Sequence, residues 1–272
     1  MAGTGHGKAG TVTGDPVSAT TTDADRNPGP PLDRAFFARE VTLVAPDLLG
    51  RIVVADGPQG PVGVRLTEVE AYAGSDDPAS HAYRGRTSRT AVMFGPPGHL
   101  YTYFVYGMHW CANVVTGPDG HASAVLLRAG EVVSGLELAR LRRPTARRDD
   151  HLARGPAGFA AVLGWARDDN GLDLCAPPRD ATRGARFHEG RPPASADVSA
   201  GPRVGVGRAA DVPWRFWISG APSVSAFRSG TRASRRTNGV PLTGEVAPDQ
   251  GPRAGKPGGP SWQDGPRDRP AP

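Results

Sequence analysis

Apolar and polar residues alternate in several short segments of the chain, and glycine or proline separates most of these segments. Alternation with a period of two indicates a β-strand, because successive side chains of a strand point to opposite faces of the sheet. Two hairpins follow from this pattern, the first around the turn DGPQG and the second with Gly107 and Met108 near its tip. The predicted strands span residues 51–55, 62–72, 100–106, 109–115, 124–129, 203–206 and 214–219.

Helical segments are fewer and shorter than the strands. Asp33 is an N-cap candidate for a short first helix, and a second helix lies within residues 41–50, with Pro46 in its first turn and Gly50 as its C-cap. We also predict helices over residues 87–93, over residues 136–143 and after Gly155-Pro156. Residues 166–198 are predicted to form a loop.

Strands and helices mix along the chain without a regular βαβ rhythm. The predicted fold class is therefore α+β: a single mixed domain with a largely antiparallel curved sheet, flanking helices and a protruding β-hairpin. Residues 1–33 contain no aromatic residue, and Trp262 is the only one after residue 228. Such segments bury too little apolar surface to offset their ordering entropy. We therefore predict a disordered N-terminal tail (1–33), one domain (34–228) and a disordered basic C-terminal tail (229–272).

Arginine supplies nearly all of the positive charge, because lysine occurs only at Lys8 and Lys256 and the net charge is +5. A guanidinium suits bidentate contacts with phosphate, so the composition favours an anionic partner without identifying it. A general bias of the genome toward arginine codons would give the same composition.

The two cysteines show neither the number nor the spacing of a disulfide framework or a zinc site. No apolar run approaches the ~20 residues of a membrane-spanning helix, and the N-terminus lacks the apolar segment of a secretory signal. We expect a soluble, cytoplasmic, monomeric protein with no cofactor, no bound metal, no contact with membranes and no protein partner.

Glu70 lies within an apolar strand, between Val69 and Ala71. A buried carboxylate needs a partner or a chemical task, because burying a bare charge costs several kcal/mol, on the order of 3–5. Arg128, at the end of another predicted strand, is a candidate partner. Two interpretations stay open: a structural ion pair, or a general base that orients and deprotonates a water for attack on a sugar carbon.

Three aromatic side chains from separate segments, Tyr72, His81 and Tyr103, are either core residues or the walls of a pocket that stacks a planar base. The tip Tyr106-Gly107-Met108 is either an ordinary hairpin end or a wedge that fills the space left by a displaced nucleotide. Several arginines form either a solvated basic face or a set of phosphate contacts. These arginines are Arg84, Arg86, Arg89, Arg140, Arg142 and Arg143.

Seven segments, in this order, resemble one known family: TEVEAY, the histidine at 81, MFGPPGHLYTYFVYGMHWCAN, VLLRA, GPAG, PRVGVG and PWRFWISGAPSVS. The family is that of the alkyladenine (3-methyladenine) DNA glycosylases shared by bacteria and animals. The resemblance covers roughly residues 34–228. It implies a single mixed domain built on antiparallel sheet, a monofunctional enzyme without metal, and double-stranded DNA as the partner, approached from the minor groove.

The resemblance also implies roles for individual residues. Glu70 matches the water-activating glutamate, Arg128 the arginine beside it, and the backbone carbonyl of Val204 the third contact of the water. Asn113 matches the asparagine that crowds the 2-amino group of guanine, and Tyr106 the intercalating tyrosine. The base pocket would consist of Tyr72, His81, Tyr103 and Asn113, the intercalating tip of Tyr106 and Met108, and the DNA-backbone contacts of Arg84, Arg86, Arg89, Arg142 and Arg154.

One position departs from the family pattern. Many relatives have a lysine two residues after the proline of the GP motif, where this chain has Gly158, and Arg154 is a candidate substitute. The expected function is excision of 3-methyladenine and 7-methylguanine, and of hypoxanthine and ethenoadenine in a wider range, at the start of base excision repair. Two other classes stay open: a non-catalytic lesion-binding DNA protein, and a metal-dependent nuclease that uses Asp76, Asp77 and His81.

Overall fold

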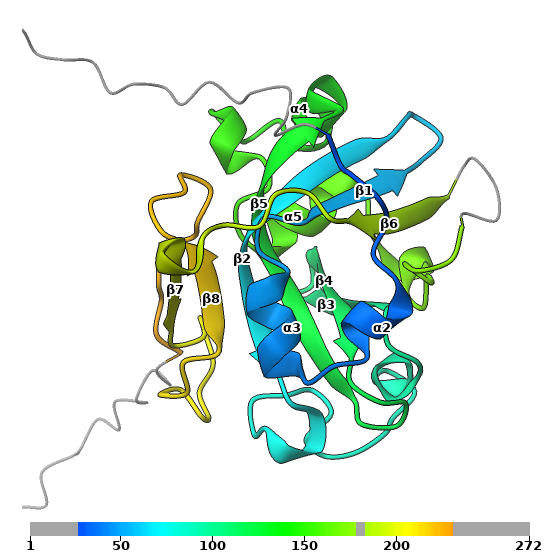
Figure 1. The fold of residues 1–272 in the computed structure, drawn as a ribbon, viewed down its shortest axis with the longest axis vertical. Coiled ribbons are helices and arrows are strands. Elements are labelled where there is room, and N and C mark those ends of the chain that lie inside the picture. The colour runs from blue at the N-terminus through cyan, green and yellow to red at the C-terminus, as the bar shows by residue number, and fades with distance from the viewer. Residues whose placement is uncertain (1–26, 178–182, 231–272) are drawn as a thin grey trace, which may run out of the picture. The chain divides into compact units, whose positions relative to one another are not determined.

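The computed structural model describes residues 27–177 and 183–230. Most of both predicted tails lies outside these residues, so their predicted disorder stays a prediction. Within the described part, the strands are β1 (Ile52–Asp56), β2 (Val62–Tyr72), β3 (Leu100–Val105), β4 (His109–Thr116), β5 (Ser123–Ser134), β6 (Gly184–His188), β7 (Val198–Gly201) and β8 (Arg215–Ile218). They form one antiparallel sheet, in which the order of the strands in space differs from their order in the sequence (Figure 1).

The strand β2 is the centre of the sheet (Figure 1). It pairs with β5 along one edge, and with β1 and then β8 along the other. The order continues from β5 to β4 and β3, and from β1 to β6. The register of β2 and β5 shifts between Leu66 and Val69, as at a β-bulge. The segment from Glu68 to Glu70 pairs with β5 on one side and with β8 on the other, so its backbone is held on both sides.

The helices are α2 (Arg34–Phe37), α3 (Val41–Asp47), α4 (Leu136–Arg142) and α5 (Pro156–Leu163) in the described residues. The Asp33 side chain accepts a hydrogen bond of 3.0 Å from the amide of Phe36, which confirms the predicted N-cap. Gly155 and Pro156 open α5 as predicted. The place of Pro46 is different. It is the sixth residue of α3 rather than part of its first turn, because the apolar face from Val41 onward sets the start of the helix.

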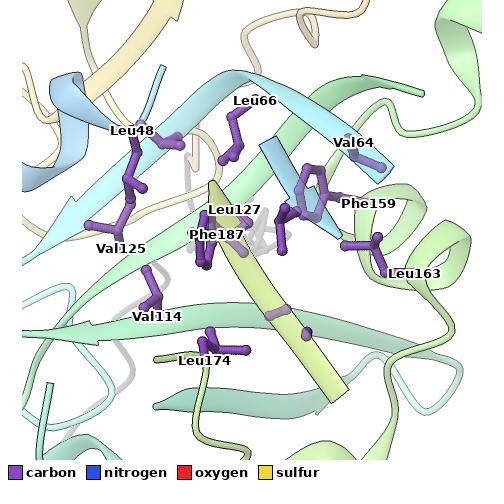
Figure 2. Close-up of a cluster of buried hydrophobic side chains, with 14 of the residues drawn as sticks. Leu48, Val64, Leu66, Val114, Val125, Leu127, Phe159, Leu163, Leu174 and Phe187 are labelled. Atoms are coloured by element: carbon purple, nitrogen blue, oxygen red, sulfur yellow. The ribbon is translucent and has the colours of Figure 1, made fainter. Parts of the chain in front are cut away.

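The hydrophobic core joins side chains from all four helices of the described residues and from the six strands β1 to β6, and Figure 2 shows part of it. Figure 2 labels ten of these residues: Leu48, Val64, Leu66, Val114, Val125, Leu127, Phe159, Leu163, Leu174 and Phe187. All ten are buried. Leu32, in the segment assigned by sequence to the N-terminal tail, is also buried, and its amide donates to the carbonyl of Phe187 over 2.8 Å.

Four segments differ from the predicted elements. The loop predicted over 166–198 contains the strand β6, which pairs with β1 at the edge of the sheet. Residues 203–206 form a turn rather than a strand, with Gly205 at a φ of 73°. The strand that pairs with β8 comes earlier, at β7. The helix predicted over 87–93 is reduced to a 3-10 turn at Ala91–Phe94.

None of the helices in the described ranges combines the length and the apolar character needed to cross a membrane.

Candidate active site

A cavity of about 690 Å³ opens between the loop after β2, the hairpin of β3 and β4, and the turn at 204–208. Its lining includes every residue that the sequence assigned to a base pocket, together with the two predicted neighbours of the carboxylate. These residues are Tyr72, His81, Tyr103, Asn113, Arg128 and Val204. Six separate segments of the chain therefore contribute to one site.

Aromatic rings form one side of this cavity and fix one another. The ring of His81 meets that of Tyr103 edge-on, with centroids 4.5 Å apart and planes at 90°. Tyr101, a residue that the sequence did not single out, stacks on Tyr103 with ring centroids 5.9 Å apart. Its hydroxyl oxygen lies 3.2 Å from Nδ1 of His81. The amide of Asn113 donates to the Tyr101 carbonyl over 3.2 Å. The pocket walls are thus positioned before any base binds.

Burial, with a smaller contribution from the nearby Arg89 guanidinium, lowers the pKa of His81 to about 4. The imidazole is therefore neutral at physiological pH. A neutral ring can stack on a cationic base without charge repulsion.

Glu70 lies immediately behind the cavity wall, and its carboxylate has no solvent exposure. Its Oε1 accepts from the amide of Val204 over 2.7 Å and lies 3.3 Å from Nη1 of Arg128. Its Oε2 accepts from the Tyr72 hydroxyl over 2.8 Å. All three donors line the cavity. Each of these cavity-lining groups therefore connects the carboxylate directly to the cavity wall. The Val204 contact with Glu70 is made by the backbone amide of Val204.

Burial raises the pKa of Glu70, although Arg128, the Val204 amide and the Tyr72 hydroxyl partly offset the shift. Burial and the adjacent Glu70 also raise the pKa of Tyr72 well above its usual range, so its hydroxyl stays protonated and donates. A carboxylate with a raised pKa is a stronger base than a free one.

A second carboxylate, Glu68, shares the same face of β2 and was missed by the sequence analysis. Its Oε1 accepts from Nε of Arg128 over 2.9 Å and from Nε of Arg215 over 2.7 Å. Ser225 adds its hydroxyl and its amide. Burial acts to raise the pKa of Glu68, but Arg128, the Ser225 amide and Arg215 outweigh it and hold the pKa low. The period-two spacing of Glu68 and Glu70 in TEVEAY was the signal that could have revealed this residue.

A buried ion pair holds the segment that carries Val204. The guanidinium of Arg203 has no solvent exposure and binds both oxygens of Asp77 and the carbonyl of Ala71. Its Cζ lies 4.6 Å from the centroid of the Tyr72 ring and 5.4 Å from that of Trp214. Arg203 therefore supports the pocket wall and the amide on Glu70 together.

The hairpin tip between β3 and β4 is exposed. The Tyr106 side chain is 86% exposed and Met108 68% exposed. Tyr106 has a φ of 53°, in the left-handed region that is uncommon for residues other than glycine, and Gly107 follows at 68°. Positive φ at two successive residues is typical of a two-residue hairpin turn, and this turn leaves the Tyr106 ring exposed beside the cavity.

The predicted DNA-backbone arginines divide into three groups. Arg84, Arg86 and Arg89 are exposed beside the cavity, and Cζ of Arg89 lies 5.8 Å from the centroid of Tyr103. Arg142 instead donates to the carbonyl of Val162 over 2.8 Å, at the end of α5. Arg140, from the same predicted basic helix, is paired with Glu137 and Asp149.

Arg154 lies 2.9 Å from Nε2 of His151 and lines a second hollow of about 430 Å³. Arg143, Arg147 and Arg148 line the same hollow. A side chain at Gly158 would begin 3.3 Å from Nη2 of Arg143. The guanidinium of Arg143 therefore lies next to the position where the family resemblance leads us to expect a lysine.

The described residues contain no group of three or more side chains of the types that ligate metals, arranged to share an ion. Asp77, one of the residues proposed for a nuclease, has both oxygens engaged by Arg203, and Nδ1 of His81 is beside the Tyr101 hydroxyl. The geometry gives no support to the nuclease hypothesis.

Comparison with known proteins identifies the family of the chain. The family model "Methylpurine-DNA glycosylase (MPG)" matches residues 35–222. A relative from Streptomyces avermitilis is 55% identical over 208 residues, which are 76% of this chain and 96% of the relative. A relative from Nocardia farcinica is 53% identical over 199 residues (71% and 92%), and one from Burkholderia lata is 49% identical over 203 residues (74% and 94%). Each carries the name "Putative 3-methyladenine DNA glycosylase". The chain belongs to the methylpurine-DNA glycosylase family, and its enzyme class is that of the DNA glycosylases, hydrolases of N-glycosidic bonds.

Proposed function

We propose that this enzyme excises 3-methyladenine and 7-methylguanine from duplex DNA, with hypoxanthine and ethenoadenine in its wider range, and leaves an abasic site. One observation carries the proposal: the three donors to the Glu70 carboxylate all line the aromatic cavity. A carboxylate offers about four lone-pair sites. Three donors reach it among the described residues, which leaves one lone-pair site for the water that the proposal requires.

In the proposed reaction, Glu70 accepts a proton from this water while the water oxygen forms a bond to C1′ of the deoxyribose. The N-glycosidic bond breaks, and its electron pair leaves with the purine. Arg128 orients the carboxylate, and the Val204 carbonyl holds the water. An alkylated base that is already cationic leaves without a second acid, which explains how one carboxylate suffices.

The rings of Tyr72, His81 and Tyr103 would enclose the extruded base. Base–aromatic stacking contributes ~1–3 kcal/mol per base and tolerates different planar bases. A cationic purine gains further from the faces of the tyrosines. Asn113, held by its bond to the Tyr101 carbonyl, would crowd the 2-amino group of normal guanine.

Tyr106 and Met108 would enter the duplex from the minor groove and fill the space of the flipped nucleotide. Their exposure supports this role, because an aromatic ring and a thioether in water gain apolar contact on entering the base stack.

Phosphate contacts would come from Arg84, Arg86 and Arg89 on one side of the cavity and from Arg154 on the other. The bond from Arg142 to the end of α5 makes it the weakest candidate in this set. Arg143 joins the set, because it lines the same hollow as Arg154. The enzyme would act as a monomer on chromosomal DNA, in the cytoplasm.

The test is a panel of duplexes, each with a single lesion, incubated with excess enzyme and then treated with alkali to cleave abasic sites. Release of the alkylated bases, without strand cleavage before alkali and without loss on addition of EDTA, supports the proposal. Tight binding with no base release from any duplex would instead indicate a lesion-binding protein. Strand cleavage before alkali that EDTA abolishes would indicate a nuclease.

A further inference from the structure

Four buried charged side chains lie together behind the cavity: Glu68, Glu70, Arg128 and Arg215. Each is at most 5% exposed, and two positive charges balance two negative ones. The cavity lining contains Arg128 but neither Glu68 nor Arg215. The outer members of this charge cluster, Glu68 and Arg215, therefore act on the site only through the inner ones.

Arg128 divides its guanidinium between the two carboxylates unequally. Its Nε binds Glu68 over 2.9 Å, whereas its Nη1 is 3.3 Å from Glu70. The bond to Glu68 fixes the plane of the guanidinium and keeps the arginine from pairing fully with Glu70. Full pairing would weaken Glu70 as a base, because an opposite charge at short range favours the ionised form.

Glu68 is itself fully engaged. Its oxygens accept from Arg128, Arg215 and the hydroxyl and amide of Ser225. Because of these bonds it stays ionised, and its negative charge raises the pKa of Glu70 on the same face of β2. Arg215 secures the arrangement by donating also to the Ser225 carbonyl over 2.7 Å.

We propose that Glu68 is a positioning residue, which shares Arg128 with Glu70 and thereby keeps Glu70 a strong enough base to activate water. Arg215 sets the strength of this effect from the far side of Glu68. The catalytic part of this inference rests on the proposed function. The effect of Glu68 and Arg215 on the proton affinity of Glu70 can be measured without catalysis.

Three other charged or titratable groups face Glu70. They are Tyr72 on β2, Tyr103 on β3 and Arg203 in the turn after β7. All three stay unchanged in the variants below, so differences between variants report the effect of Glu68 and Arg215.

The first readout is the single-turnover rate of release of 7-methylguanine, a base that is already cationic, as a function of pH. The rate of the wild-type enzyme rises with pH as Glu70 loses its proton. Glu68→Gln leaves two buried arginines facing one carboxylate, so this rise moves to lower pH by about one unit and the plateau rate falls. Arg215→Met removes a positive charge, so the rise moves to higher pH. Arg215→Lys keeps the charge, and we expect it to restore the wild-type position.

The second readout is the ¹³C resonance of the Glu70 carboxyl carbon in free enzyme labelled on glutamate, assigned by its loss in Glu70→Gln. Its titration midpoint should fall in Glu68→Gln and rise in Arg215→Met. Asp173→Asn, which breaks a half-exposed ion pair with Arg34 elsewhere in the fold, is the control and should leave the midpoint unchanged.

Opposite shifts in the two variants support the proposal. Unchanged midpoints in both variants, or shifts in the same direction, would overturn it, even if both variants were less stable. If Glu68→Gln fails to fold, the difference between the titration midpoints of Arg215→Met and Arg215→Lys tests the proposal by itself. If the wild-type enzyme released no base while the carboxyl midpoints moved as expected, the proposed function would fail and this inference would stand.

Discussion

The charge cluster behind the cavity and the hairpin tip at its mouth follow opposite rules. Glu68, Glu70, Arg128 and Arg215 are buried, and each has partners that hold it. Tyr106 and Met108 are mostly in solvent, and the tyrosine sits on a left-handed backbone. Chemistry on a bound base needs groups fixed in advance, because electrostatic help that must first reorganise costs rate. Entry into a duplex needs apolar groups without protein partners.

This difference predicts how the two regions respond to mutation. Changes behind the cavity should affect stability and chemistry, since removing one partner leaves another charge buried alone. Changes at the tip should affect DNA engagement with little effect on folding.

Asp77→Asn should reduce the free energy of unfolding by about 3–5 kcal/mol, because it leaves the fully buried Arg203 without its counter-charge. Urea denaturation measures the loss. The matched control is Asp47→Asn, whose partner Arg39 is half-exposed, and it should cost less than about 1 kcal/mol. Equal losses in the two variants would show that the ion pair beneath Tyr72 is not a main support of the pocket.

Tyr106→Ala should weaken the complex with lesion-containing duplex by about 1–3 kcal/mol, the contribution of one stacked ring. Its free energy of unfolding should change by less than about 0.5 kcal/mol, since the side chain is 86% exposed. Binding by fluorescence anisotropy and urea denaturation measure the two quantities. Leu141→Ala on α4, which removes another exposed apolar side chain, should alter neither. A Tyr106→Ala protein that binds DNA normally but has a lower free energy of unfolding would contradict the assignment of the tip to DNA binding.

His81 gives the smallest effect. Its pKa in the folded protein is about 4, below the 6.5 of a free imidazole. Between these values the unfolded chain binds more protons than the folded one, so the free energy of unfolding falls as pH falls through this window. NMR titration of the His81 ring should give a midpoint near 4, and His81→Gln should remove this part of the pH dependence. His81 keeps some exposed surface, so a midpoint near 6.5 would mean that its neighbours in the pocket do not desolvate the imidazole.

The sequence predicts the central sheet well, because the β-branched and aromatic runs of β2, β3 and β4 are buried along most of their length. It fails at residues 203–206. The segment looks like a strand, but the Val204 amide bonds to a side chain of β2 and Arg203 is drawn in by Asp77. Partners distant in sequence decide its conformation. The edge strand β6 is missed for a similar reason, since pairing with β1 defines it more than its own pattern does.

The sequence predicts which residues lie together at the candidate site, but not how their side chains share partners. Arg128 and the aromatic walls do meet at one cavity, and Glu70 lies behind it, 3.3 Å from Nη1 of Arg128. The sequence could not show that Arg128 binds Glu68 more closely than Glu70, because register and side-chain distances decide that choice. Nor could it show that Arg142 would be used to cap α5.

The central claim is that Glu70 performs the chemistry from behind the cavity wall. The most direct test compares Glu70→Gln with the wild-type enzyme in single-turnover release of 7-methylguanine, together with the affinity of each for the same duplex. Glu137→Gln, whose side chain is 84% exposed on α4, is the control and should match the wild-type enzyme in both quantities. The account predicts a rate about 10²–10⁴ times lower in Glu70→Gln, with affinity nearly unchanged. A Glu70→Gln enzyme that releases the base at the wild-type rate would contradict it.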